Sequence, residues 1–505
     1  MALASQVLKY NHVLIQSPNT GGKAFDLTAH LEHMEYFENI MSPTISMKMK
    51  IRSSFNFVSG LPIRGGEMIA IELETLGGTF KFGKVDGDGI KPGSGELYVY
   101  GMKNLDQPSQ AQTFTLHIVP LEYFKNETSR CMFKFKSQTI DQHVRQILGP
   151  HVMNIDPDRI GIIEKTKNTY SFIGNTKKPF HTITWLCPKS ITGSKQGVSG
   201  EGEKAKAVGT AGYFFYENQD GFNFRSIEGL VSKTRDFDDS SDSKQRGTDI
   251  HGPYVYQGHG AISSLYKLEE NFKINFFHID RGSDIRKALA VGQYANKTIF
   301  FDSLTHVCSQ YDYKLEDEVQ NILGEEYEVD GTKLPAPNGL RSLPTRLFVR
   351  ISDHGTVGIG SDGFETSGID EAYAAKSFSR YNALFSQSLN IQVSLNTNLK
   401  VGDIINCVFP ELSGGQSLNL DEAASGNYLI VRVNHHIQPN ASFSSLNLIR
   451  DSYGYKKIST DYGEPAVEGG YTISKKNLKT TGQLVRADTA QYGNTFPAGS
   501  FNITN

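Results

Sequence analysis

The sequence predicts a mainly β fold, with strand-rich modules at both ends of the chain and an α/β piece between them. Between 27 and 100, apolar and polar residues alternate with the two-residue period of half-buried strands. Between 389 and 451, three segments again read as antiparallel strands. The 49 glycines outnumber the 18 prolines, as in chains with many tight turns. These observations favour antiparallel barrel or sandwich modules.

The first module shows the alternation most clearly. Ile45, Met47, Met49 and Ile51 fall on one face, and Ser46, Lys48, Lys50 and Arg52 fall on the other. The glycine pairs Gly65-Gly66 and Gly77-Gly78 mark turns between strands. We therefore expect consecutive antiparallel strands with one buried face.

One kind of structure gives way to another between 114 and 148. Apolar residues at every second position over 114–119 predict a strand, which Pro120 ends because it lacks a backbone donor. A helix then follows Thr139, which forms a capping box with Gln142 and closes at Gly149. A β module is therefore expected to lead into an α-containing module here.

The middle of the chain carries mixed signals. A second helix is expected to begin at Pro179, with Phe180, Ile183, Thr184 and Cys187 on its inner stripe and Trp185 beside it. A hairpin is predicted around the turn dipeptide Asp220-Gly221. Helix signals also appear over 284–295 and 371–388, the second with Ala374, Phe378, Tyr381 and Phe385 as its buried stripe. Strand signals appear at NFKINFF, TIFFD and LFVRIS.

Composition excludes several classes of protein. A net charge of −3 argues against a surface that grips nucleic acid throughout. The four cysteines are scattered without a CxxC pair, which favours buried thiols in a reducing compartment. We expect neither a signal peptide nor a membrane anchor, because no long apolar run is present.

The motifs with chemical potential have structural interpretations that fit better. The GxxxxGK-like stretch from Gly78 has Val85 where a magnesium-ligating hydroxyl is required, and it alternates like a strand. The Asp86–Gly89 stretch is interpreted as a β-turn rather than a calcium loop. The histidines of His30-Leu-Glu-His33 and His435-His436 are interpreted as surface or packing residues. With no nucleophile elbow or paired carboxylates, we expect no enzymatic activity, no metal and no cofactor.

Several stretches follow one another in the order and spacing of a known family. They are Tyr36–Ile40, Gly65–Glu67 leading into Met68–Ile71, Phe133–Ile140 with Val144, Ile147 and Leu148, Pro179-Phe180 with Ile183, Trp185 and Leu186, Phe214–Glu217 followed by Asp220–Ser226, Leu399–Asp403, and Gly426–Ile430 with His436. Together they resemble the central baseplate hub protein of T-even-type contractile-tailed phages, whose fold recurs in the hub part of VgrG-type secretion spikes. The resemblance covers about Leu27 to Asp451, and its most specific match lies at 214–226.

The resemblance implies two tube-type antiparallel β-barrel domains and an intervening α/β domain. The expected boundaries are 1–128 for the first barrel, 129–250 with a helix at 369–388 for the α+β domain, 251–350 with 389–455 for the second barrel, and 456–505 for an extended C-terminal arm. The structural residues that it marks are Gly66, Glu67, Pro179, Trp185, Asp220, Gly221, Phe224, Gly402, Asp403 and Tyr428.

In that family three subunits form a ring, so that two barrels per chain give six similar contacts to a sixfold tail tube. The implied partners are a trimeric central spike, tail tube or tube-initiator proteins, baseplate wedge proteins and the tape measure protein, with DNA only in transit. The implied location is the virion tail baseplate, after assembly in the host cytoplasm. The alternatives are the hub of a type VI secretion or tail-derived injection machine, a tail-associated cell-wall hydrolase and a polysaccharide-binding module.

Overall fold

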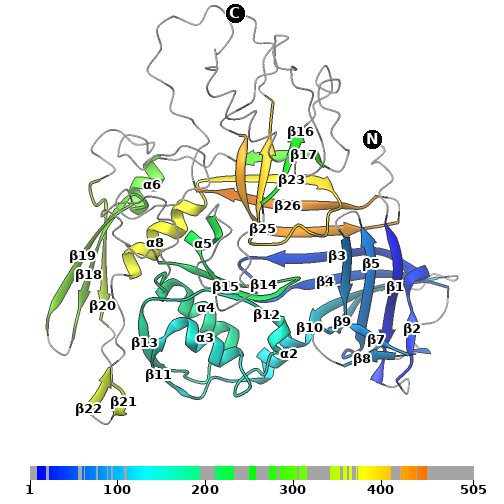
Figure 1. Cartoon of the computed structure of the whole chain (residues 1–505), viewed down its shortest axis with the longest axis horizontal. Helices are drawn as coiled ribbons and strands as arrows, with labels where there is room; N and C mark the ends of the chain where they lie inside the picture. The colour runs from blue at the N-terminus through cyan, green and yellow to red at the C-terminus, as the bar shows by residue number, and fades with distance from the viewer. Residues whose placement is uncertain are drawn as a thin grey trace, which may run out of the picture.

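The computed structural model confirms a mainly β protein with an α+β insertion (Figure 1). It describes residues 8–18, 22–54, 60–61, 63–75, 78–87, 89–92, 95–106, 111–193, 211–231, 250–256, 272–280, 285–303, 306–315, 342–352, 356–360, 363–366, 371, 373–410, 421, 424–439 and 441–451. In this described part, none of the helices has the length and apolar character needed to cross a bilayer.

The first β module curls around a single apolar core. Its strands are β1 (Lys9–Gln16), β2 (Ala24–Asp26), β3 (Leu31–Asn39), β4 (Ser46–Ser53), β5 (Met68–Thr75), β6 (Gly78–Phe82), β9 (Leu97–Asp106) and β10 (Gln112–Pro120). They follow the order β2-β1-β5-β9-β10-β4-β3, with β6 beside β5. The buried faces of β1, β3, β4, β5 and β10 share one core, so the alternation predicted at 45–52 is confirmed.

A small hairpin of β7 (Lys84–Asp86) and β8 (Gly89–Lys91) lies beside this module. The stretch from Gly78 therefore forms strands, as its alternation predicted. Asp86 pairs with Gly89 across a tight turn, which agrees with the predicted β-turn, although Asp88 lies outside the described residues.

The second β module is a closed barrel. Its six strands are β16 (Ile250–Tyr256), β17 (Lys273–Asp280), β23 (Gln387–Ser394), β24 (Ile404–Val408), β25 (Gly426–Ile437) and β26 (Phe443–Arg450). They pair in the order β25-β24-β16-β17-β23-β26, and β26 pairs again with β25 to complete the ring. Strand β16 runs parallel to both of its neighbours, so this barrel is mixed where the sequence predicted antiparallel pairing. Parallel neighbours cannot be joined by a tight hairpin, so the local alternation that predicts strands does not give this pairing.

One strand pair joins the two modules into a continuous fourteen-stranded sheet. Strand β3 of the first module runs antiparallel to β25 of the second, from Arg432 opposite Asn39 to Ile437 opposite Met34. Figure 1 shows the blue strands of the first module beside the orange strands of the second. The two β modules are therefore held together by backbone hydrogen bonds rather than by a linker.

The α+β unit lies below the barrel and beside the first β module (Figure 1). It consists of α2 (Leu121–Thr128), β11 (Lys134–Thr139), α3 (Ile140–Leu148), η3 (Pro157–Arg159), β12 (Ile160–Ile163), β13 (Thr169–Ile173), α4 (Pro179–Leu186), η4 (Cys187–Lys189), β14 (Tyr213–Asn218), β15 (Gly221–Ser226) and α5 (Ile227–Val231). The capping box at Thr139 and the proline-initiated helix at Pro179 are confirmed. Helix α2, which begins directly after Pro120, was not predicted.

A smaller three-stranded sheet lies at the side of the molecule. It orders β19 (Cys308–Lys314), β18 (Ala295–Phe301) and β20 (Arg346–Ile351), with α6 (Ile285–Val291) nearby and α8 (Tyr373–Leu384) against it. A short hairpin of β21 (Thr356–Gly360) and β22 (Gly363–Thr366) follows. The stripe predicted for the helix at 371–388 is wrong at Phe385, which follows the last residue of α8 and is 44% exposed, while Arg380 on α8 is buried. Arg380 is buried because it pairs with Glu228 and Asp451.

The predicted domain boundaries stay a prediction. Within 251–350, β16 and β17 belong to the barrel, whereas β18, β19 and β20 form the separate side sheet. The predicted polar loop at 194–210, the charged crossing at 234–248 and the arm at 456–505 lie outside the described residues.

Candidate functional site

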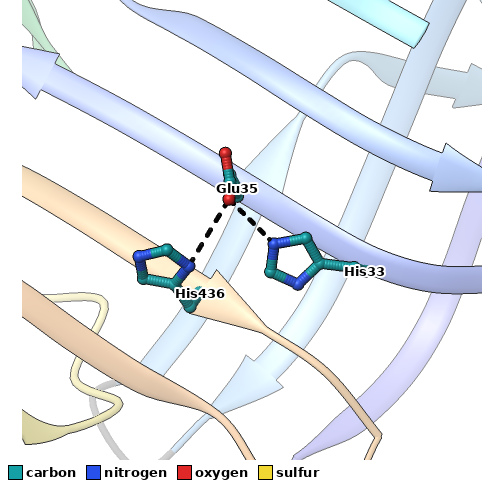
Figure 2. A group of neighbouring side chains, drawn as sticks. All are labelled: His33, Glu35 and His436. Carbon is teal, nitrogen blue, oxygen red and sulfur yellow. Dashed lines mark hydrogen bonds and ion pairs between the residues drawn. The ribbon is translucent and has the colours of Figure 1, made fainter. Parts of the chain in front are cut away.

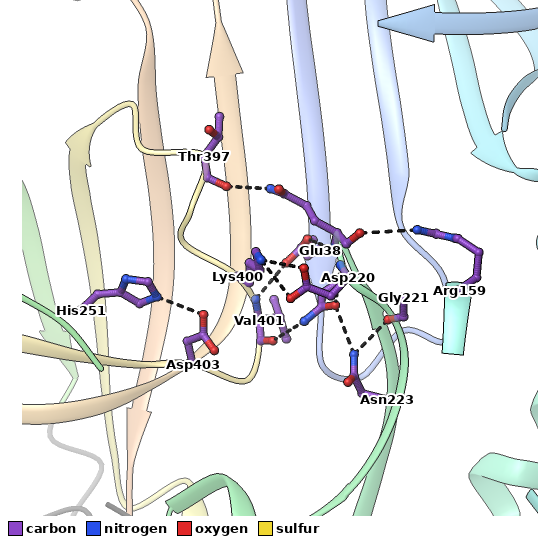
Figure 3. A network of polar contacts seen from close by, with 12 residues as sticks. Glu38, Arg159, Asp220, Gly221, Asn223, His251, Thr397, Lys400, Val401 and Asp403 are labelled. Atoms are coloured by element: carbon purple, nitrogen blue, oxygen red, sulfur yellow. Dashed lines mark hydrogen bonds and ion pairs between the residues drawn. The ribbon is translucent and has the colours of Figure 1, made fainter. Parts of the chain in front are cut away.

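The hairpin β14–β15 lies where the α+β unit meets both β modules. Every residue of the two strands is buried, because each face of the hairpin packs against a core. Phe214 and Tyr216 point into the barrel core, and Tyr213 and Phe215 point into the α+β core. Its turn contacts both β3 and the barrel loop at 396–403. We call the polar contacts around this turn the joint (Figure 3).

Glu38 of β3 is the centre of the joint. Its carboxylate accepts hydrogen bonds from the Tyr36 hydroxyl at 2.8 Å, from Gln219 N at 2.9 Å and from Val401 N at 2.8 Å. The side chain is buried, and burial raises the pKa of Glu38 to about 7 against the hydrogen bonds from Val401, Tyr36 and Gln219, which lower it. One carboxylate therefore bridges the first β module, the hairpin and the barrel.

Glu217 makes a second bridge. One carboxylate oxygen accepts a hydrogen bond from Ile45 N at 3.0 Å, and the other forms an ion pair with the Arg159 guanidinium. Burial acts to raise the pKa of Glu217, and the Arg159 charge acts to lower it. Because both side chains are buried, removing one of them would leave the other without its partner in a low-dielectric site.

Contacts at the rim complete the joint (Figure 3). Lys400 Nζ lies 2.8 Å from Asp220 Oδ1, and the Gln219 amide donates to Thr397 O at 2.8 Å. Across the same loop, His251 Nε2 lies 3.0 Å from Asp403 Oδ2. These contacts orient the barrel loop against the hairpin turn.

Two glycines permit the close approach of these segments. Gly221 has a φ of +123°, and a Cβ there would lie 2.1 Å from the Arg159 carbonyl oxygen. Gly402 has a φ of +92°, and its Cβ would lie 2.1 Å from the Tyr216 hydroxyl. A side chain at Gly221 would push the hairpin turn away from η3, and one at Gly402 would push the barrel loop away from the hairpin.

Four of the ten marked residues therefore lie in the joint: Asp220, Gly221, Gly402 and Asp403. The other six lie elsewhere. Glu67 accepts backbone hydrogen bonds from Arg64 and Gly65, next to Gly66 in a left-handed turn. Pro179 begins α4, and Trp185 on that helix is 40% exposed under the Lys189 ammonium. Phe224 is in the α+β core, and Tyr428 is in the barrel core.

Glu38 and Glu217 lie within stretches that carry the resemblance, but neither they nor Arg159 were marked as structural residues from the sequence. A signal for Glu38 was present, because it takes the inward position after Met34 and Tyr36 in the alternation of β3. A carboxylate on the buried face of a strand requires specific partners. Apart from Tyr36, the partners of Glu38 lie 181 and 363 residues away in the sequence, so no local pattern could name them.

Among the described residues, one group of side chains has the composition of a metal site. His33, Glu35 and His436 place a ligand atom each within 4.8 Å of the others. The predicted role of these histidines as surface or packing residues fits His435, which is fully buried and hydrogen-bonded to the Ser444 hydroxyl. His33 and His436 are half-buried and face each other.

No known protein-family model matches the chain, and no curated protein matches it. Among solved structures, it is similar to the tail protein from Neisseria meningitidis MC58, with 12% identity and a TM-score of 0.44 over 87% of this chain and 96% of that one. It is also similar to the 43 kDa tail protein of prophage MuSo2 from Shewanella oneidensis, with 9% identity and a TM-score of 0.45 over 87% and 98% of the two chains. A type VI secretion system component of E. coli matches with 9% identity and a TM-score of 0.39, over 89% of this chain and 78% of that one.

Proposed function

We propose that this protein is a structural adaptor, the homotrimeric central hub of a contractile-tail baseplate. It would join a sixfold tail tube to a threefold central spike. The observation that carries this proposal is the continuous fourteen-stranded sheet, which holds two β modules of one chain in a fixed relation. Three such chains offer six β modules, so one ring can present sixfold contacts on one side and threefold contacts on the other.

The joint supports a mechanical role. A hub must transmit force from the tube to the spike without bending between its modules. Backbone pairing of β3 with β25 and the hydrogen bonds that the Glu38 and Glu217 carboxylates accept from Val401 N and Ile45 N resist such bending, because separating the modules would break all of them together. In this role the side chains hold a shape and do not react.

A homotrimer requires a surface for contact between subunits, and the side sheet offers one. On β20, Leu347, Val349 and Ile351 are 56%, 70% and 75% exposed. They share one sheet face with Ile299 and Phe301 of β18. Among the described strands, β20 pairs only with β18, so its outer edge carries open backbone groups. We propose a second copy of the chain as the occupant of this face, because exposed apolar faces beside open edges drive association.

The remaining partners follow from the same proposal. One end of the ring would contact the tail tube or its initiator proteins, and the other end would contact the trimeric spike. Baseplate wedge proteins would bind on the outside of the ring. The tape measure protein and DNA would lie in the lumen. A net charge of −3 suits a channel that DNA passes without being retained. The site of action would be the virion tail.

The mass of the purified chain in solution tests the proposal, followed by negative-stain imaging. We expect a trimer and a ring with a central hole. A monomer at all concentrations, or a closed particle without a hole, would contradict it. Clearing of peptidoglycan by the same preparation would favour the alternative of a tail-associated cell-wall hydrolase. Assembly on a secretion spike rather than a phage spike would favour the hub of an injection machine.

A further inference from the structure

The seam between the two β modules carries a cluster of side chains that the adaptor role does not use (Figure 2). His33 and Glu35 lie two residues apart on one face of β3, and His436 of β25 lies directly opposite Glu35. His33 Nε2 is 3.0 Å from Glu35 Oε1, and His436 Nδ1 is 3.7 Å from the same oxygen. The two imidazole rings stack with their centroids 5.7 Å apart.

We propose that His33, Glu35 and His436 form a binding site for a zinc ion, with water in the fourth position. Two imidazole nitrogens and one carboxylate oxygen are a ligand set that Zn²⁺ accepts when a fourth position stays open. Ligand atoms about 2.0–2.2 Å from a tetrahedral zinc lie roughly 3.3 Å from one another. The two carboxylate-to-imidazole separations fall on either side of that value, and all three ligand atoms lie within 4.8 Å of one another, so side-chain rotations that draw the ligand atoms together would bind the ion.

A second layer of amides supports this assignment. Gln438 Nε2 lies 2.9 Å from His33 Nδ1, and Asn434 Nδ2 lies 2.8 Å from His436 Nε2. The Asn434 Oδ1 atom is buried without a hydrogen-bond partner. Turning both amides by half a turn brings their oxygens to the ring nitrogens, which then donate to them, and leaves the His33 Nε2 and His436 Nδ1 lone pairs free for a metal. Metal-binding histidines are commonly oriented by such a partner on the other ring nitrogen.

The charges around the cluster are compatible with a cation. Lys48 lies 3.7 Å from Glu35 Oε2, the oxygen that faces away from the histidines, and Lys50 is paired with Glu32. Glu35 Oε1 is therefore turned toward both imidazole rings, and Oε2 is turned toward the Lys48 ammonium.

Such an ion would connect β3 of the first module to β25 of the second. It would therefore stabilise the same seam as the joint, on a different surface of the strand pair. Zinc that binds the folded chain but not the unfolded chain would raise the stability of the folded chain. This inference does not depend on the proposed function, because it concerns a contact within one chain.

The test is equilibrium dialysis of the tag-free, chelator-treated chain against micromolar Zn²⁺, with the bound metal measured by mass spectrometry. We expect one zinc per chain in the wild type and in His278→Ala, which removes an exposed strand histidine outside the cluster. His33→Ala and His436→Ala should lose that zinc, and Asn434→Ala should weaken binding by about 10–100-fold. Zinc should raise the unfolding temperature of the wild type and leave that of both histidine variants unchanged.

Two results would overturn the proposal. One is a wild-type chain that retains no zinc, which would make the cluster an ordinary ion pair. The other is equal zinc retention by the wild type and both histidine variants, which would place the metal elsewhere. Circular dichroism checks that each variant is folded. If a histidine variant is unfolded, Glu35→Gln, which keeps the side-chain shape, is tested in its place.

Discussion

At the scale of single residues, the joint depends on carboxylates placed where apolar residues would normally lie. Glu38 and Glu217 are both buried. Each accepts hydrogen bonds from a distant part of the chain, and Glu217 also forms an ion pair with Arg159. Burying a carboxylate has a free-energy cost that only specific partners offset. We infer that these residues favour one arrangement of the three units, because any other arrangement would leave a buried carboxyl without its partners.

The raised pKa of Glu38 makes the joint sensitive to pH. Its pKa is about 7 in the folded chain, against 4.5 for an ordinary glutamate, so the folded state holds this proton more tightly than the unfolded state. Its contribution to stability is therefore fully present at low pH and falls as pH rises from about 4.5 through 7. We expect Glu38→Gln to have a lower free energy of unfolding than the wild type at pH 5, measured in urea. The reason is that the side-chain amide nitrogen cannot accept a hydrogen bond from Val401 N.

The difference in free energy of unfolding between the wild type and Glu38→Gln should shrink by on the order of 3 kcal/mol between pH 5 and pH 8. This magnitude follows because one pKa unit corresponds to about 1.4 kcal/mol. Glu32→Gln, at an exposed position on the same strand, serves as the control and should follow the wild-type pH profile. A difference that is constant with pH would show that Glu38 is ionised throughout this range.

The buried and rim ion pairs of the joint should respond very differently to mutation. Arg159→Met leaves Glu217 buried without its cation and should lower the free energy of unfolding by about 3–5 kcal/mol. Asp220→Asn breaks the exposed pair with Lys400 and should cost less than about 1 kcal/mol. Urea unfolding followed by circular dichroism measures both. Equal losses in the two variants would mean that the Arg159–Glu217 contact is not a buried pair in solution.

At the scale of elements, the hairpin β14–β15 shows how far local sequence patterns reach. The Asp220-Gly221 turn, its flanking strands and the capping box at Thr139 were all predicted, because turn and capping chemistry involves residues within a few positions of one another. The β3–β25 pair was not predicted, because the two strands lie about 400 residues apart in the sequence, and barrels were expected through the family resemblance. Alternation predicts that a strand has a buried face but does not name its partner.

The glycines of the joint provide a test at this scale. Gly221→Ala places a Cβ against the Arg159 carbonyl, a backbone atom that cannot rotate away, and should lower the free energy of unfolding by on the order of 4 kcal/mol or more. Gly66→Ala is the matched control, since Gly66 also has a positive φ but no atom lies within 4 Å of the added Cβ. The free energy of unfolding of this control should fall by only about 1–3 kcal/mol, because of backbone strain.

Thermal unfolding of both variants measures the contrast, and the single Trp185 on α4 reports on the α+β unit by its fluorescence. If Gly221→Ala lost no more stability than Gly66→Ala, the close approach of η3 to the hairpin turn would not exist in solution.

At the scale of the whole molecule, the exposed face of the side sheet should decide whether copies of the chain associate. Val349→Asp places a charge in the centre of that face, where Val349 is 70% exposed. The variant should fold normally, because the side chain has few contacts within its own chain, but a charge buried between subunits without a partner costs several kcal/mol. We expect the trimer to dissociate at concentrations at which the wild type stays associated.

Sedimentation analysis over a dilution series measures this change, and Val85→Asp is the control. Val85 lies on the small hairpin beside the first module and is 40% exposed, so the same substitution there should leave association unaffected. A Val349→Asp protein that remains trimeric would place the subunit contact on another surface while leaving the proposed trimer intact. Loss of association in both variants would point instead to a general effect of added charge, because the two positions lie on different sheets.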